Sequence, residues 1–236
     1  MKQIFILVLS SLILLGSCDE GNIYPEEVKT TSSGFSAKFS GTISGYQDWE
    51  KAEKYSLVIA CFPEVVDNNK TQYAILSKTI PTPDNSGKIS VVLTNIPQTA
   101  KTVEICVIGS LRNKLLSFYS QNITEQDTMF MVADLNADMF KAVQDNIFTP
   151  TCSSCHGGSS SAAAGVVLTE GNVNIVTRNS KNVEGSLLVS PGDYQSSVLY
   201  KMLSTDLTST WKFDHSRLVT SSDLLTLVKL WIDNQE

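Results

Sequence analysis

The chain has 236 residues, of which 42% are hydrophobic and 18% are charged, as in a globular protein rather than a disordered one. Its 24 acidic residues outnumber its 18 basic ones, and the formal net charge is −6 at pH 7. A nucleic-acid partner usually needs a basic patch, so we expect none. The length allows one large domain or two small ones.

An export signal is predicted at the start of the chain, residues 1–17. Lys2 precedes an apolar run from Ile4 to Leu15, which is typical of a secretory signal peptide and too short to span a bilayer comfortably. The run ends Leu15-Gly16-Ser17-Cys18, which resembles the lipobox of bacterial lipoproteins. The resemblance implies that Cys18 carries lipid and anchors the protein to the outer membrane, facing the periplasm or the cell surface. A cleaved signal with an incidental cysteine is the alternative.

Residues 18–33 are polar and are predicted to form a flexible tether. Strand signals follow in residues 34–134, separated by turn residues such as those at 83–87. The expected strands are 35–45, 55–63, 72–80, 87–96, 102–110, 114–122 and 128–134. Seven short strands in about a hundred residues predict an N-terminal all-β sandwich, immunoglobulin-like or transthyretin-like. This region contains no histidine and shows no catalytic pattern, so we expect a spacer or a partner-binding module.

Helical patterns begin after residue 134. Phe140, Val143 and Ile147 are spaced as on one helix face, and Pro150 is predicted to end that helix. Further helices are expected at 196–204 and at 222–234, the latter starting after Thr220. Residues 135–236 are therefore predicted to form a small all-α domain, and the chain is predicted to be multidomain.

The strongest chemical signal is Cys152-Ser153-Ser154-Cys155-His156, the CxxCH pattern of c-type haem attachment. Two thiols about one helical turn apart can each add to one haem vinyl group, and the next histidine can then bind the iron. A zinc site and a redox-active dithiol are alternatives, but the dithiol motif usually accompanies a βαβ pattern, which is absent from this sequence. The export signal favours haem c, because this haem is attached outside the cytoplasm.

Other motifs around CxxCH occur in a familiar order. They are Ile147-Phe148, Pro191-Gly192-Asp193, Ser197-Val198-Leu199-Tyr200, Ser222-Asp223 and Trp231-Ile232-Asp233. Over about a hundred residues this order resembles the small cytochrome c domain of bacterial envelope lipoproteins and larger haem enzymes. The resemblance implies a cytochrome c-like fold for residues 135–236, with one covalent haem c held by Cys152, Cys155 and His156.

One departure from this family concerns the second axial ligand of the iron. The Met-Pro segment of the family is missing, and Phe213-Asp214-His215-Ser216-Arg217 stands in its place. His215 is the only other histidine in the chain. We therefore expect His215 to be the sixth iron ligand. Met202 is the rival, and an open or water-bound iron is the third option.

The remaining cysteines are Cys61 and Cys106. The cell envelope permits disulfides, so these two residues form either a bridge or two free buried thiols.

Together these patterns predict a lipid-anchored monohaem cytochrome that transfers single electrons at the cell envelope, an electron carrier rather than an enzyme. Its partner would be a redox protein that the sequence does not identify. A peroxidase-like haem enzyme or a sensor is the first alternative, and it requires an open iron site. A surface lipoprotein that binds glycan or protein is the second, with Trp49, Tyr46 and Tyr55 as candidate binding residues.

Overall fold

The computed structural model describes residues 34–65, 70–124, 128–157, 162–169, 171, 175 and 185–235. The predicted signal peptide, the lipidation site Cys18 and the tether lie outside these residues. From Gly34 onward the chain forms one compact unit. In the part of the chain that is described, no helix has the length and apolar character needed to cross a membrane.

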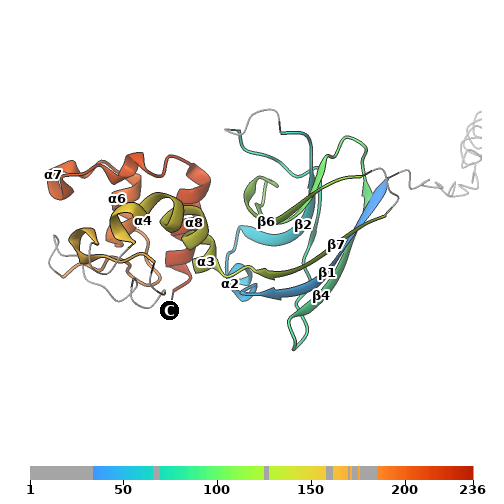
Figure 1. Cartoon of the computed structure of the whole chain (residues 1–236), viewed down its shortest axis with the longest axis horizontal. Coiled ribbons are helices and arrows are strands. Elements are labelled where there is room, and N and C mark those ends of the chain that lie inside the picture. The colour runs from blue at the N-terminus through green and yellow to red at the C-terminus, as the bar shows by residue number, and fades with distance from the viewer. Residues whose placement is uncertain are drawn as a thin grey trace, which may run out of the picture. The chain divides into compact units, whose positions relative to one another are not determined.

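Strands lie in all seven ranges that the sequence predicts, and they form two sheets (Figure 1). The three-stranded sheet has the order β4-β1-β7, in which β1 is antiparallel to β4 and parallel to β7. The four-stranded sheet has the order β3-β2-β5-β6 and is antiparallel throughout. The bounds are β1 Phe35–Ser44, β2 Tyr55–Phe62, β3 Leu76–Thr79, β4 Lys88–Ile96, β5 Thr102–Gly109, β6 Lys114–Asn122 and β7 Thr128–Asn136.

Alternation of apolar and polar residues explains why the strands bury one face. In β4 the side chains of Ile89, Val91 and Leu93 are buried, whereas those of Lys88 and Ser90, on either side of Ile89, are exposed. Successive side chains of a strand point to opposite faces, so this pattern directs one face to the core. The inner faces of both sheets contribute to the same cluster of buried side chains.

Short helices and connecting loops make up most of the chain after β7. Their bounds, together with that of α2 in the loop after β1, are α2 Gln47–Glu50, α3 Met139–Val143, the π-helix η2 Gln144–Cys152, α4 Ser153–His156, the 3₁₀-helix η3 Ala163–Gly165, α6 Val198–Ser204, α7 Thr208–Trp211, the 3₁₀-helix η4 His215–Arg217 and α8 Ser222–Asp233. The cap of α8 is Ser221, one residue later than the predicted Thr220, and its hydroxyl accepts a hydrogen bond from the Leu224 amide at 3.4 Å.

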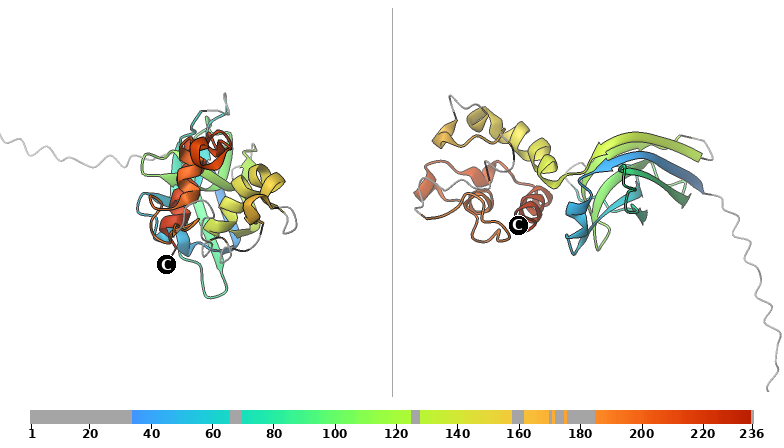
Figure 2. Two further views of the ribbon diagram at one scale, coloured as in Figure 1. Left: turned by 90° about the vertical axis from the view of Figure 1, so that its left-hand side faces the viewer. Right: turned by 90° about the horizontal axis from the view of Figure 1, so that it is seen from below.

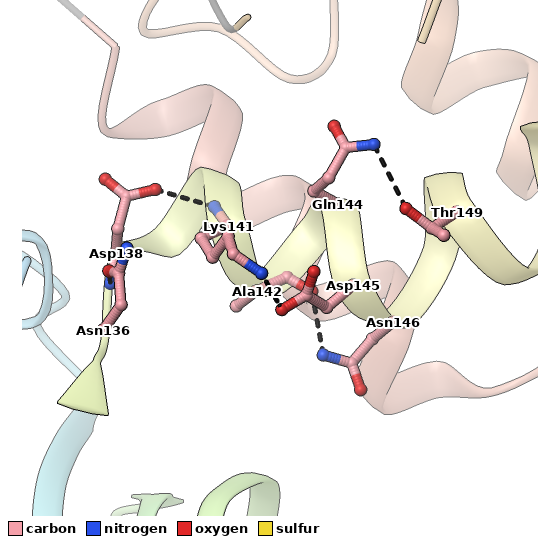
Figure 3. Close-up of polar contacts among 8 residues, drawn as sticks. All are labelled: Asn136, Asp138, Lys141, Ala142, Gln144, Asp145, Asn146 and Thr149. Carbon is pink, nitrogen blue, oxygen red and sulfur yellow. Dashed lines mark hydrogen bonds and ion pairs between the residues drawn. The ribbon is translucent and has the colours of Figure 1, made fainter. Parts of the chain in front are cut away.

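The prediction that Pro150 ends the first helix is wrong. The chain continues from α3 through Pro150 as a π-helix that ends at Cys152. Proline disrupts an α-helix because it lacks an amide hydrogen and clashes with the carbonyl four residues earlier, and a wider π-turn relaxes that crowding. Side chains bond along the same stretch: Asn146 donates to the Ala142 carbonyl at 2.8 Å, and Gln144 donates to Thr149 at 3.3 Å (Figure 3).

The loop after β1 is bonded to the start of α3. The Asp138 carboxylate caps α3 by accepting a hydrogen bond from the Lys141 amide at 2.7 Å (Figure 3). The carboxylate of Asp48, in α2, accepts from the Met139 amide at 2.9 Å, and the Trp49 ring nitrogen donates to the Ala137 carbonyl at 2.6 Å. The start of α3 is therefore fixed both by its own cap, Asp138, and by side chains about 90 residues away in the sequence.

The predicted fold class, an all-β sandwich followed by a separate small all-α cytochrome c-like domain, is wrong. The described residues form a mixed α/β fold, rich in strands, within one compact unit. A single buried cluster includes Phe39 of β1, Met139 of α3 and Trp231 of α8. The physical reason is the shortness of the helices: apart from η2 and α8, each described helix has seven residues or fewer. Helices of this length depend on a shared core.

Cys61 and Cys106 are two free buried thiols. In the register of β2 and β5, Cys61 pairs with Val103, which lies three residues before Cys106. An odd separation along a strand points side chains to opposite faces, so the two sulfur atoms lie on opposite sides of the sheet and form no bridge. Burial raises the pKa of both thiols.

Candidate functional site

A cavity of about 450 Å³ lies among the segments between η2 and α8. Its size is within the usual range for sites that bind small molecules and cofactors. Most of the lining side chains are apolar. The lining residues are Thr151, Cys152, Ser154, Cys155, His156, Ala163, Ala164, Val166, Leu168, Leu188, Leu199, Met202, Leu203, Trp211, Phe213, His215 and Leu218.

The three residues of the CxxCH motif all line this cavity. Cys152 ends the π-helix, and Cys155 follows three residues later in α4, so both thiols can reach the same wall. Cys152 is buried, whereas Cys155 is exposed. Burial raises the pKa of Cys152 to about 11, and the neighbouring Cys155 adds to the effect. Cys152 is therefore a neutral thiol at neutral pH.

His156 is held in one tautomer by a backbone carbonyl. Its Nδ1 atom lies 3.1 Å from the carbonyl oxygen of Val166. A carbonyl only accepts hydrogen bonds, so Nδ1 carries the proton and the lone pair of Nε2 is free. The Leu168 amide also donates to the His156 carbonyl at 2.8 Å, which fixes the segment opposite α4. This arrangement is the usual one for a histidine that binds a metal.

His215 lies on a different segment, in η4, and is held in the same way. Its Nδ1 atom lies 3.1 Å from the carbonyl oxygen of Phe213, which again leaves Nε2 free. Burial lowers the pKa of His215, as does the charge of His156, and the neutral imidazole is the form that binds metals. Asp214 stabilises the turn by accepting hydrogen bonds from the Ser216 amide at 3.1 Å and from the Arg217 guanidinium at 2.6 Å.

The two histidine rings face one space. Their centres are 6.4 Å apart, and their planes are inclined by 35°. Two imidazole nitrogens that each lie about 2 Å from one metal ion place the ring centres about 6 Å apart. The spacing therefore fits a single iron between His156 and His215.

The donor set fits a haem better than a bare ion. The described residues contain no group of three or more His, Cys, Asp or Glu side chains that could hold a metal ion. A closed zinc site needs four protein ligands, whereas a haem brings four nitrogens of its own. The apolar walls suit a porphyrin ring. Met202, the rival ligand, also lines the cavity, and it lies in α6 between the lining residues Leu199 and Leu203.

Sequence reasoning did not identify the aromatic part of the wall: it named Phe213 only as a member of the segment around His215, and it did not name Trp211. Trp211 and Phe213 line the cavity from α7 and the turn after it, and Phe213 is 55% exposed. No helix was predicted there, because the apolar residues of this stretch follow neither a helical nor a strand period. Isolated large apolar residues in a polar segment were the available signal.

The aromatic residues expected near the sheets do not form an exposed platform. Trp49 is buried, and it packs edge-on against Phe118 with ring centres 6.2 Å apart. Tyr46 and Tyr55 are partly buried and pack against the same core. These three side chains contribute to packing.

Comparison of the chain with protein-family models, with curated proteins and with solved structures finds no match.

Proposed function

We propose that this protein is a monohaem c-type electron carrier, in which Cys152 and Cys155 attach the haem and His156 binds its iron. The observation that carries this proposal is the meeting of all three CxxCH residues in one apolar cavity with a second histidine. A CxxCH sequence that occurs by chance is not expected to line a cavity of cofactor size.

His215 is the proposed second axial ligand. Its ring lies at a suitable distance from that of His156, and both rings offer a free Nε2. When bound, haem supplies an iron that changes between the ferric and ferrous states. The chain's own residues would attach the ring, orient both imidazoles through backbone carbonyls and surround the ring with mostly apolar side chains. None of these tasks makes or breaks a substrate bond, which favours an electron carrier over an enzyme.

The location at the cell envelope rests on the sequence. Cys18 would carry the lipid anchor and residues 18–33 would form the tether, with a redox protein as partner. Both segments lie outside the described residues.

The decisive experiment tests covalent attachment. The full chain, expressed with the c-type maturation machinery, should keep its haem in denaturing electrophoresis, and Cys152→Ser with Cys155→Ser should lose it. Cys61→Ala with Cys106→Ala is the matched control, because these thiols do not line the cavity, and it should keep the haem.

Loss of haem from the unaltered chain in the denaturing gel would contradict the proposal. A visible spectrum of the purified protein then separates the alternatives. A six-coordinate low-spin spectrum supports electron transfer. A high-spin spectrum with ready binding of carbon monoxide would instead favour the enzyme or the sensor.

A further inference from the structure

Strand β7 exposes apolar side chains at the edge of its sheet. Phe130 is 66% exposed and Val132 is 74% exposed, and Met131 between them is fully buried. Figure 2 shows β7, in yellow-green, running beside β1, in blue. Among the described residues β1 is its only strand partner. Within the described ranges, the other edge of β7 therefore has no strand partner, and it lies next to exposed apolar side chains.

The other three edge strands of the described sheets carry features that discourage pairing. β3 has four residues, the register between β5 and β6 shifts twice, and on β4 the ammonium of Lys78 donates to the Val92 carbonyl at 3.0 Å. Short length, bulges and lysines are the usual means by which proteins protect sheet edges. In contrast, β7 pairs with β1 over nine residues without a register shift, and it contains no proline, lysine or arginine.

We propose that β7 pairs antiparallel with β7 of a second copy of this chain, around a two-fold axis at Met131. In this register Phe130 lies opposite Val132 of the second copy, and Val132 lies opposite Phe130. Aromatic and β-branched residues stabilise each other when they face across strands. Each copy thus packs its two exposed side chains beside those of the other, which is the self-complementarity that a two-fold interface requires.

The polar residues of β7 agree with the same register. Asp134 lies opposite Thr128 of the second copy, so the two carboxylates do not face each other. In the described structure only Oδ1 of Asp134 accepts hydrogen bonds, from the Thr42 amide and hydroxyl at 3.2 and 2.7 Å. Its Oδ2 is thus available to a hydroxyl across the interface. Met129 and Met131 stay in the core, so dimerisation needs no repacking.

The association is expected to be weak, because seven residues of each strand (128–134), about 24 Å long, face each other in this register and bury less area than a standard interface. The test is sedimentation of the full chain carrying Cys18→Ala, over about 1 to 200 μM, so that lipid does not affect the measured mass. A monomer–dimer equilibrium is expected. Phe130→Lys with Val132→Lys places like charges opposite each other and should weaken it about tenfold.

A charge-paired variant tests the register. Phe130→Lys with Val132→Glu places Lys opposite Glu at both facing positions, and the dimer should return. Leu111→Lys, which replaces an exposed apolar residue in the hairpin between β5 and β6, should leave the dimer unchanged. Phe130, Val132 and Leu111, the three positions compared in these variants, are exposed, so thermal unfolding should be unaltered. A chain that stays monomeric throughout, or a Lys/Glu variant no better than the Lys/Lys variant, would overturn the proposal.

Discussion

The sheets and the segment that follows them use apolar residues in opposite ways. Phe39 and Ile105 are fully buried in a closed core, whereas Met202, Trp211 and Phe213 line a cavity of about 450 Å³. Protein interiors contain few voids larger than a water molecule. A large apolar cavity in a chain that otherwise packs well therefore indicates a binding site. Among the described residues, the proposed haem site is thus the place where apolar side chains line a cavity and do not fill a core.

Non-glycine residues with positive φ also lie in different surroundings in the two regions. In the strand region the non-glycine residues with positive φ are Asn95, next to the last residue of β4, and Arg112, in the hairpin between β5 and β6. In the later segment Lys212 ends α7 with a φ of 62°, and Ala164 has a φ of 53° and lines the cavity. Alanine gains nothing from this conformation, so the surrounding structure must impose it.

The largest expected effect comes from the closed core. Phe39→Ala should lower the free energy of unfolding by about 3–5 kcal/mol, because it leaves a void in tight packing. Leu168→Ala, at the cavity wall, should cost about 2 kcal/mol in the haem-free chain, since part of its surface already faces empty space. Urea unfolding followed by circular dichroism measures both. Equal losses would contradict the distinction between core and cavity.

The second prediction concerns the iron. In the haem-loaded protein His215→Ala should open one axial position, so that cyanide binds the ferric form and carbon monoxide the ferrous form. Met202→Leu should change the spectrum little. The unaltered protein should also have a lower reduction potential than a His/Met haem, because Met ligation raises it. If Met202→Leu opens the iron and His215→Ala does not, Met202 is the ligand.

The smallest effect is expected at the start of α3, where the chain passes from the sheets to the cavity segment. Asp138→Ala removes the cap of α3 and should cost about 1 kcal/mol in thermal or urea unfolding. Lys141→Ala removes an exposed ion pair with Asp145 and serves as the control, with a loss of at most about 0.5 kcal/mol. A larger loss for Lys141→Ala than for Asp138→Ala would mean that the cap does not fix this helix.

Local patterns predicted much of the secondary structure. Strand alternation located all seven strands, and helical spacing located α6 and α8 to within two residues. The π-helix was not predictable in this way, since it depends on which backbone carbonyl accepts the hydrogen bond of each amide. The fold class failed because periodicity shows that a face is buried but does not show against which partner. Phe39 and Trp231 join one core although 192 positions of the sequence separate them.

The candidate site divides in a similar way. Cys152, Cys155 and His156 are found by their spacing, because the chemistry of attachment sets that spacing. His215 is found because the sequence offers no other histidine. Trp211 is found only through the fold, since its position at the cavity depends on how α7 packs, and Phe213 was named in the sequence only as a neighbour of His215.

The carbonyl bonds to the two histidines have a consequence for how this protein can vary. The acceptors are backbone oxygens of Val166 and Phe213, which every amino acid possesses. Replacement of either side chain changes the shape and polarity of the cavity wall but leaves the acceptor atom in the chain. The orientation of the imidazoles and the composition of the cavity wall can therefore change independently of each other. Mutation can alter the surroundings of the proposed haem by small steps without first losing the orientation of His156 and His215.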